Sequence, residues 1–403
     1  MEASERPSAQ PVQTKDQSFF YFLTYGICFI SLGLAMASLG PVLPFMAEHI
    51  DVSFGQISFL FTASSLGYLT GSAGGGRLYD RFKGHHLMLI AVSLMVVMSI
   101  LVPIIPIFFP LLLVMFFFGL GQGMLDVGGN VNLLWVFQAR VGPYMNALHF
   151  CFGVGAFLAP IVMHHVMKLA GGAITWPFWV LALLFLPSLV GLWALRSPTN
   201  PEISDDHEGK KSVDYRLVVL MMVLFFIYVG VETGFGGWIF TYATEGKIAD
   251  EAGASYMNSI FWGALTLGRL VSVLLAKRLK PSTLLIGNFG LAIAFLGLIL
   301  IFPQNTPIVW VVSAGLGFSL SSVFPTLLAL GESRMKITGA VTGMFFLGSS
   351  LGGTLVPMLL GQIFEYVGAY EIMLTLFSGA VLGLIVLISV IFASNRVGEK
   401  ARS

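Results

Sequence analysis

Two acidic residues lie within long apolar stretches of this sequence. Asp126 lies in VMFFFGLGQGMLDVGGNVNLLWVF, and Glu232 lies in VVLMMVLFFIYVGVETGFGGWIF. Each stretch is long enough to cross a bilayer, where a carboxylate near the midplane costs at least a few kcal/mol. An acid kept at such a position usually faces a cavity and touches an ion or a solute. We therefore expect both acids to serve function rather than packing.

Asp126 belongs to a polar stripe on its helix. Gln122, Asp126 and Asn130 are four residues apart, and residues at this spacing share a helical face. Carboxylate and amide oxygens suit a hard cation such as sodium, and the carboxylate could instead take a proton. The stripe predicts a coupling-ion site, in which Asn130 could also reach a substrate. The alternative is a structural acid bonded to a neighbouring helix.

Glu232 has a tyrosine, Tyr228, one turn earlier on the same face. A carboxylate can accept two hydroxyls of a sugar, so this pair predicts substrate binding; a second proton site or an acid paired to a basic side chain are the alternatives. Trp238 lies six residues later, about 120° away on an ideal helix. It could stack on a sugar only if the helix breaks at the intervening glycines, and a membrane-interface anchor is its rival role.

Asn146 and His149 are three residues apart and face together on a further apolar stretch. Amide and imidazole groups both donate and accept hydrogen bonds, which suits a polyol, although a lone histidine is often a packing residue. The spacing offers no metal-ligand set around His149. Three aromatic residues are weaker substrate candidates: Trp135, Trp262 and Phe324.

The composition indicates an integral membrane protein. Of 403 residues 56% are hydrophobic and only 10% are charged, against about 25% charged in soluble proteins. The two cysteines lie in apolar runs and form neither a disulfide framework nor a metal motif. The net charge of +1 gives no case for nucleic acid. The polar start shows no cleavage site, so we expect the first apolar run to remain as a span.

A membrane span needs about 20 mostly apolar residues, and only helices satisfy the backbone of such spans. The sequence predicts an all-α protein with twelve spans, at about 19–47, 55–79, 87–107, 109–138, 143–168, 175–195, 216–244, 255–279, 282–302, 306–333, 337–366 and 369–394. Pro103, Pro106 and Pro110 mark the break between the third and the fourth.

Basic residues orient these spans. With the N-terminus inside, all of the 21 Lys and Arg except Lys168 and Lys247 fall on cytoplasmic segments or helix ends. This positive-inside bias and the even span count place both termini in the cytoplasm. We expect a tail at 1–18, a six-helix bundle at 19–195, a cytoplasmic linker at 196–215, a second bundle at 216–394 and a tail at 395–403.

The two halves repeat one another. GRL at 76–78 returns at 268–270, GLG at 119–121 returns at 315–317, and GVGAFLAP at 153–160 returns as SSLGGTLVP at 349–357, each about 195 residues later. Two parallel six-helix repeats predict a substrate site between the halves, near the midplane, that is reached by rocking one half against the other. Arg77 and Arg269 match across the repeats, and with Asp80 and Arg81 they predict salt bridges of a cytoplasmic gate.

The segment GRLYDRFKG at 76–84 resembles the signature loop of the major facilitator superfamily, whose Asp and Arg pin the cytoplasmic gate. Within it, the chain resembles the group of the fucose permease and the sodium-dependent glucose transporter. MLDVGGN at 124–130, MNALHF at 145–150 and GVE at 230–232 carry this likeness. The resemblance implies helices 4, 5 and 7 around a central cavity, and a monomer. The fucose permease has an acidic proton site in its first helix, whereas SLGLAMASLGPVLPFM at 31–46 holds none, which favours sodium.

The sequence thus predicts a secondary transporter that imports a hexose or related polyol by symport with sodium or a proton, without a cofactor. Proton-coupled export of amphipathic drugs or lipids is the alternative, and the polar stripes argue against it. A membrane sensor on a transporter scaffold is another alternative. It would need a large soluble signalling domain, and the linker and the tails are short. No Ser-His pair, aspartate dyad or HExxH motif indicates an enzyme. The short polar tails and the lack of a glycosylation sequon suit the cell membrane of a bacterium, that is, its inner or plasma membrane.

Overall fold

The structure, a computed structural model, describes residues 15–198, 215–335 and 339–400 and contains no strand within them. Most of the predicted N-terminal tail and linker lies outside these residues, as do residues 401–403 of the predicted C-terminal tail. The first half, residues 15–198, contains α1 (Lys15–Ala37), α2 (Leu39–His49), α3 (Phe54–Ile57), α4 (Phe59–Tyr79), α5 (Gly84–Leu101), η1 (Val102–Ile104), α6 (Phe108–Phe137), η2 (Gln138–Arg140), α7 (Val141–Leu169) and α8 (Thr175–Ala194).

The second half, residues 215–400, contains α9 (Tyr215–Glu245), α10 (Glu251–Ala276), α11 (Pro281–Ile301), α12 (Thr306–Leu320), α13 (Val323–Arg334), α14 (Gly339–Tyr366) and α15 (Ala369–Lys400). By length and apolar composition, 11 helical segments of the described residues could cross a membrane. The second expected span, α4, is not among them because Gly, Ser and Thr residues dilute its apolar character. With α4, these segments form the twelve spans that the sequence predicts.

Two of the expected spans are interrupted. The span predicted at 19–47 is divided at Ser38 into α1 and α2, because Pro41 has no N–H for the carbonyl of Ala37. The span predicted at 306–333 is divided at residues 321–322 into α12 and α13, where Pro325 likewise leaves the Ser321 carbonyl without a helical donor. The expectation of one unbroken helix was wrong at both places. The break after α1 turns α2 toward the second half, where it packs on α9.

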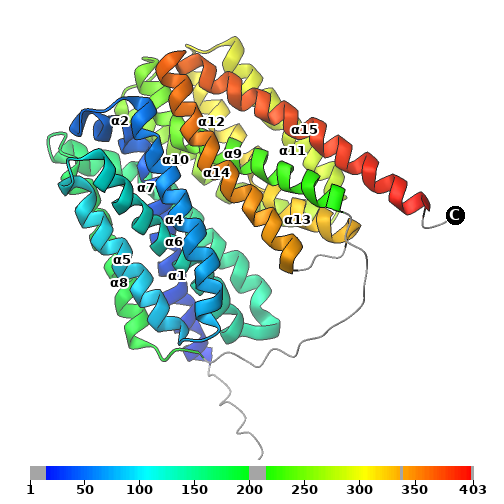
Figure 1. The fold of residues 1–403 in the computed structure, drawn as a ribbon, viewed down its shortest axis with the longest axis horizontal. Coiled ribbons are helices and arrows are strands. Elements are labelled where there is room, and N and C mark those ends of the chain that lie inside the picture. The colour runs from blue at the N-terminus through cyan, green and yellow to red at the C-terminus, as the bar shows by residue number, and fades with distance from the viewer. Residues whose placement is uncertain (1–14, 199–214, 336–338, 401–403) are drawn as a thin grey trace, which may run out of the picture.

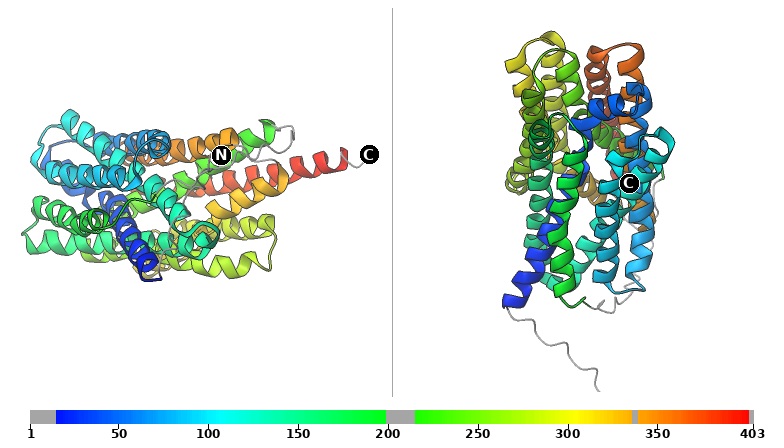
Figure 2. Two further views of the ribbon diagram at one scale, coloured as in Figure 1. Left: turned by 90° about the horizontal axis from the view of Figure 1, so that it is seen from below. Right: turned by 90° about the vertical axis from the view of Figure 1, so that its left-hand side faces the viewer.

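The two halves lie side by side as bundles (Figure 1, Figure 2). Most helix pairs form within a half, such as α4 with α6 and α14 with α9, while α7–α10, α4–α14, α3–α14 and α2–α9 join the halves. We call the end where α1 begins, α8 ends and α9 begins the linker end. The opposite end, which holds α2 and the loops at 170–174, 246–250 and 302–305, is the distal end.

Glycines let some helices approach to backbone contact. A methyl group at Gly67 of α4 would lie 1.8 Å from the Phe116 carbonyl oxygen, and one at Gly119 of α6 would lie 1.9 Å from the Ser64 carbonyl oxygen. Gly352 plays the same part between α14 and α9. Small residues provide this fit because lipid supplies no hydrophobic force between helices, so that close packing must hold them together.

Candidate functional site

A cavity of about 1390 Å³ lies between the halves. Its walls come from helices of both halves, principally α1, α4, α6 and α7 on one side and α9, α10, α13 and α14 on the other. The lining residues reach Leu279 and Pro281 at the linker end, but toward the distal end they stop at Gly40, Gly237 and Pro357. The cavity therefore opens toward the linker end and is closed toward the distal end.

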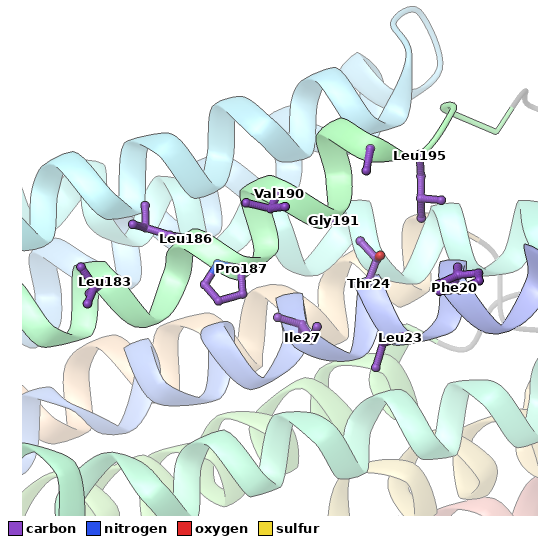
Figure 3. Close-up of a pocket in the computed structure, with 11 residues that line it drawn as sticks. Phe20, Leu23, Thr24, Ile27, Leu183, Leu186, Pro187, Val190, Gly191 and Leu195 are labelled. Atoms are coloured by element: carbon purple, nitrogen blue, oxygen red, sulfur yellow. The ribbon is translucent and has the colours of Figure 1, made fainter.

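A second hollow of about 620 Å³ lies on the surface between α1 and α8 (Figure 3). Its walls are apolar apart from Thr24, which projects from α1. A groove without a set of converging polar groups offers no means to orient a polar solute. We therefore place the functional site in the central cavity.

Asp126 forms the centre of a hydrogen-bonded cluster in the first half, and the other members of this cluster carry no charge. The Tyr68 hydroxyl donates to Asp126 Oδ2, and the Asn130 amide donates to Asp126 Oδ1 at 2.9 Å. Among the described residues these are its polar side-chain contacts, and neither is basic. Gln122 lines the cavity one turn nearer the distal end. The three residues predicted for the coupling ion thus face the same cavity, joined by a tyrosine from another helix.

The contact between Tyr68 and Asp126 depends on the close packing of α4 and α6. A methyl group at Gly123 would lie 2.1 Å from the Tyr68 carbonyl oxygen, so the two backbones meet one turn before Asp126. At this separation the phenol of α4 spans the gap to the carboxylate of α6. A carboxylate has about four lone-pair directions, and the two donors use two of them. Room for a cation or a proton remains on the cavity side.

Glu232 forms the second cluster, in the other half. The Tyr228 hydroxyl donates to Glu232 Oε2, one helical turn along α9. Arg269 of α10 also lines the cavity, and its guanidinium interacts with the Tyr228 hydroxyl and attracts the Glu232 carboxylate electrostatically. The negative charge of Glu232 therefore has a positive counterpart, which Asp126 does not have within the described residues.

His149 and Asn146 line the cavity from α7, as their spacing predicts. The His149 ring meets the Phe29 ring edge-on, with 5.8 Å between centroids, and it also lies within the electrostatic reach of Arg269. Asn146 is exposed to the cavity. Arg269 is thus flanked by an acid of its own half and a histidine of the other half.

Three of the four residues predicted for the gate lie together, and Arg269 lies apart from them. Arg77, Asp80 and Arg81 are exposed at the linker end, where α4 finishes. Arg77 is in the last turn of α4, whereas α10 continues for seven residues beyond Arg269, to Ala276. The matched arginines of the repeats therefore lie at different depths. Arg269 lines the cavity beside Glu232, and its part in a gate stays a prediction, because the linker end is open in this structure.

Trp238 does not line the cavity. Its predicted role in stacking required a break in the helix after Glu232, but α9 is continuous, so the indole points elsewhere. The ring is fully buried, and its N–H donates to the Pro357 carbonyl oxygen at 2.9 Å. Of the three weaker aromatic candidates, Trp262 and Phe324 line the cavity, while Trp135 is buried outside it.

The distal closure joins the halves by packing and a few hydrogen bonds. The Gln362 amide donates to the Gly55 carbonyl oxygen at 2.7 Å, and the Gly55 N–H donates to Glu365 Oε2 at 2.5 Å. Ser58 donates to the Met358 carbonyl oxygen at 3.2 Å. Every one of these bonds runs between α3 or its following residue and α14. The closure can therefore separate without breaking either bundle.

Tyr68 is the principal site residue that the sequence argument missed. It lies 58 residues before Asp126, and no local spacing connects the two. A signal did exist, because Ser65, Tyr68 and Ser72 recur at helical spacing and all line the cavity. The two serines are typical of helix packing in a glycine-rich helix, so this face does not stand out in the sequence.

Comparison with known proteins identifies the family. The family described as Major Facilitator Superfamily matches residues 25–357. The chain belongs to this superfamily. It is therefore a multi-pass integral membrane protein and a transporter, not an enzyme. Human sodium-dependent glucose transporter 1 is similar to it, with 30% identity over 370 residues, covering 83% of this transporter and 71% of the human protein.

Two solved structures share the fold of this transporter. A mutant of the nucleoside transporter NupG aligns with a TM-score of 0.75 at 13% identity, covering 92% of this chain and 99% of that one. A bacterial homologue of the human lysosomal transporter Spinster, in an inward-facing and unoccupied conformation, aligns with a TM-score of 0.68 at 14% identity, covering 95% and 96%. The expected architecture of twelve spans in two six-helix repeats is confirmed.

Proposed function

We propose that this transporter imports a hexose or a related polyol by symport with a sodium ion or a proton. In this proposal Asp126 binds the coupling ion, with Asn130 and Gln122 beside it. Glu232, Tyr228 and Arg269 bind the substrate from the second half. Asn146 and His149 bind it from the first, and the halves rock to expose the cavity alternately to each side.

The unequal surroundings of the two acids carry the assignment of roles. Glu232 has Arg269 as a charge partner, whereas the side-chain contacts of Asp126 among the described residues are a phenol and an amide. A buried charge without a partner is costly, so Asp126 gains most from a cation or a proton. In the first half of the cavity, α1 contributes apolar side chains such as Leu32 and Met36, and no acid that could share this role.

The second cluster suits a neutral, hydroxyl-rich solute. Carboxylate oxygens accept from sugar hydroxyls, the guanidinium donates to them, and imidazole and amide do both. Trp262 offers an aromatic wall at the distal limit of the cavity. The human relative is named a sodium-dependent glucose transporter, which supports the same class of substrate and ion.

We further propose that the linker end faces the cytoplasm. The exposed Arg77 and Arg81 lie at this end, as do the turn residues Lys277 and Arg278 after α10, in line with the positive-inside rule. In that orientation both termini are cytoplasmic and the structure is inward-open. The membrane is that of the cell surface, an inner or plasma membrane.

Export of an amphipathic compound is the second candidate, because the cavity mouth is apolar. Leu270, Val273 and Leu279 line it from α10 and the turn that follows, with Phe346 opposite on α14. A polar solute leaves through such a mouth readily, but an amphipathic one would be held there. The two candidates therefore differ in which part of the cavity binds.

The test is uptake of radiolabelled D-glucose into proteoliposomes under an inward sodium gradient or an inward proton gradient. If one ion is coupled to one sugar, a tenfold ion gradient can sustain an inside-to-outside sugar ratio of up to about ten. Each tenfold concentration ratio corresponds to a free energy of ~1.4 kcal/mol. Asp126→Asn should abolish accumulation yet preserve exchange between equal pools. Glu232→Gln should weaken binding itself. Absence of accumulation under both gradients, with any sugar of a hexose panel, would refute the proposal.

A further inference from the structure

One face of α10 carries polar residues along its length. Ser255, Asn258 and Ser259 lie toward the distal end, and Thr266 and Arg269 follow on the same face at helical spacing. Trp262 lies between the two groups. Trp262, Thr266 and Arg269 line the open cavity. The three residues toward the distal end are only 0–1% exposed. The polar face of α10 thus continues past the point at which the cavity is closed.

Several polar atoms near the distal end of this face lack hydrogen-bond partners, although the Asn258 amide N–H donates to the Gly236 carbonyl oxygen at 2.9 Å. Within the described residues, no partner contacts the hydroxyls of Ser255 and Ser259, the amide oxygen of Asn258 or the indole N–H of Trp262. Buried polar groups are nearly always bonded, so a cluster of unsatisfied groups calls for an explanation.

Elements of the first half cover this face. Phe157 of α7 packs against Gly263, and His165 of α7 is bonded to the Tyr256 hydroxyl at 2.9 Å. The second cover is α2, which contacts α9 and α10, with Gly40 against the Gly237 backbone. Since α10 and α9 belong to the second half, rocking of the halves that opens the distal end uncovers the face.

We propose that Ser255, Asn258 and Ser259 form an outer binding subsite for a neutral, hydroxyl-rich solute, which opens when the distal end opens. The inference rests on the proposed function for the class of solute and on the burial of these groups for the site. Sugar hydroxyls can donate hydrogen bonds to the serine and amide oxygens, and they can accept hydrogen bonds from the serine hydroxyls. None of the three carries a charge, so the subsite offers no counter-charge to an ionic solute. Trp262 separates the subsite from the central cavity and presents its ring and N–H to a sugar that passes inward.

Cysteine accessibility tests the subsite without knowledge of the substrate. Asn258→Cys and Ser259→Cys are introduced singly into the full chain after its two cysteines, Cys28 and Cys151, are replaced by alanine. A charged, membrane-impermeant thiosulfonate is then added outside intact cells. The matched control is Ser313→Cys on α12, which is equally buried but is bonded within its own helix to Val309 at 2.9 Å.

The expected result is labelling of both α10 cysteines about tenfold or more faster than of the control, because only transiently opened sites react. Saturating D-glucose should slow this labelling. Labelling no faster than the control would overturn the subsite, and so would labelling that glucose leaves unchanged in a protein that accumulates glucose. If the sugar hypothesis alone is at fault, both cysteines will still react while glucose uptake is absent.

A second measurement separates binding from folding. Ser259→Ala removes a hydroxyl that has no partner in the described residues, so the KM for glucose added outside should rise about fivefold, as for one lost neutral hydrogen bond to the solute. The KM for glucose leaving from the inside should not change, because the subsite is closed in the inward-open state. An equal rise on both sides would contradict the outer location. Ser313→Ala, with the same loss of a buried polar group, should alter neither value.

Discussion

Replacement of Tyr68 by phenylalanine should tighten binding of the coupling ion. The Tyr68 phenol donates a hydrogen bond to the Asp126 carboxylate. Loss of the hydroxyl destabilises the ion-free carboxylate, but it affects the ion-bound carboxylate less, because the ion supplies the missing positive charge. The difference between the two states therefore moves in favour of the bound ion.

The size of the effect follows from the type of bond. A hydrogen bond to a charged group contributes about 1.5–3 kcal/mol. Asp126 is half-buried and faces the cavity, so water partly replaces the lost donor and the lower limit applies. A change of ~1.4 kcal/mol is tenfold in an equilibrium constant. We expect the half-saturating ion concentration for Tyr68→Phe to fall about tenfold.

The assay is the initial rate of glucose uptake against sodium concentration, and separately against external pH. Tyr228→Phe is the matched control, because it removes the same hydroxyl from the other acid. It should change the KM for glucose and leave the half-saturating ion concentration within about twofold, in keeping with the ±0.5 kcal/mol of a distant substitution. An unchanged or increased half-saturating ion concentration for Tyr68→Phe would contradict this prediction, since the hydroxyl would then bind the ion instead of competing with it.

Three further substitutions test the geometry. Arg269→Gln leaves the Glu232 carboxylate without its positive counterpart and should destabilise the protein by roughly 2 kcal/mol, less than for a fully buried pair because the cavity admits water. Glu232→Gln in the same chain should restore the melting temperature, and failure of this rescue would show that the two charges do not interact. Gly119→Ala should lower the free energy of unfolding by about 1–3 kcal/mol, because the added methyl group overpacks α6 against α4. A methyl group at Gly74 meets nothing within 4 Å, so Gly74→Ala should melt like the unsubstituted protein. Equal melting temperatures of the two variants would disprove the close contact. Trp238→Phe removes the bond to Pro357 across spans of the second half, at a cost of about 1 kcal/mol, and should lower the melting temperature without altering the KM for glucose; a rise in that KM would return Trp238 to the substrate site.

Several features could be predicted from the sequence because they are local. Apolar runs of membrane length, glycine-rich repeats and basic turns identified the twelve spans and the two halves. Helical spacing placed Gln122, Asp126 and Asn130 on one face, and it did the same for Asn146 and His149. All five residues line the central cavity. In each case residues close in sequence share one helix, so that 3.6-residue periodicity is enough to relate them.

Other features depend on which helices meet. Tyr68 joins Asp126 because glycines bring α4 against α6, and spacing along the chain carries no record of that approach. Arg269 matches Arg77 in sequence but lies in the cavity, because α10 extends farther past its arginine than α4 does. The spans, their division into halves and the polar faces can be read from the sequence, since these follow from hydropathy and helical period. The tertiary structure alone decided the partners of each acid, because charge and hydrogen-bond contacts between helices depend on their relative depth, rotation and separation.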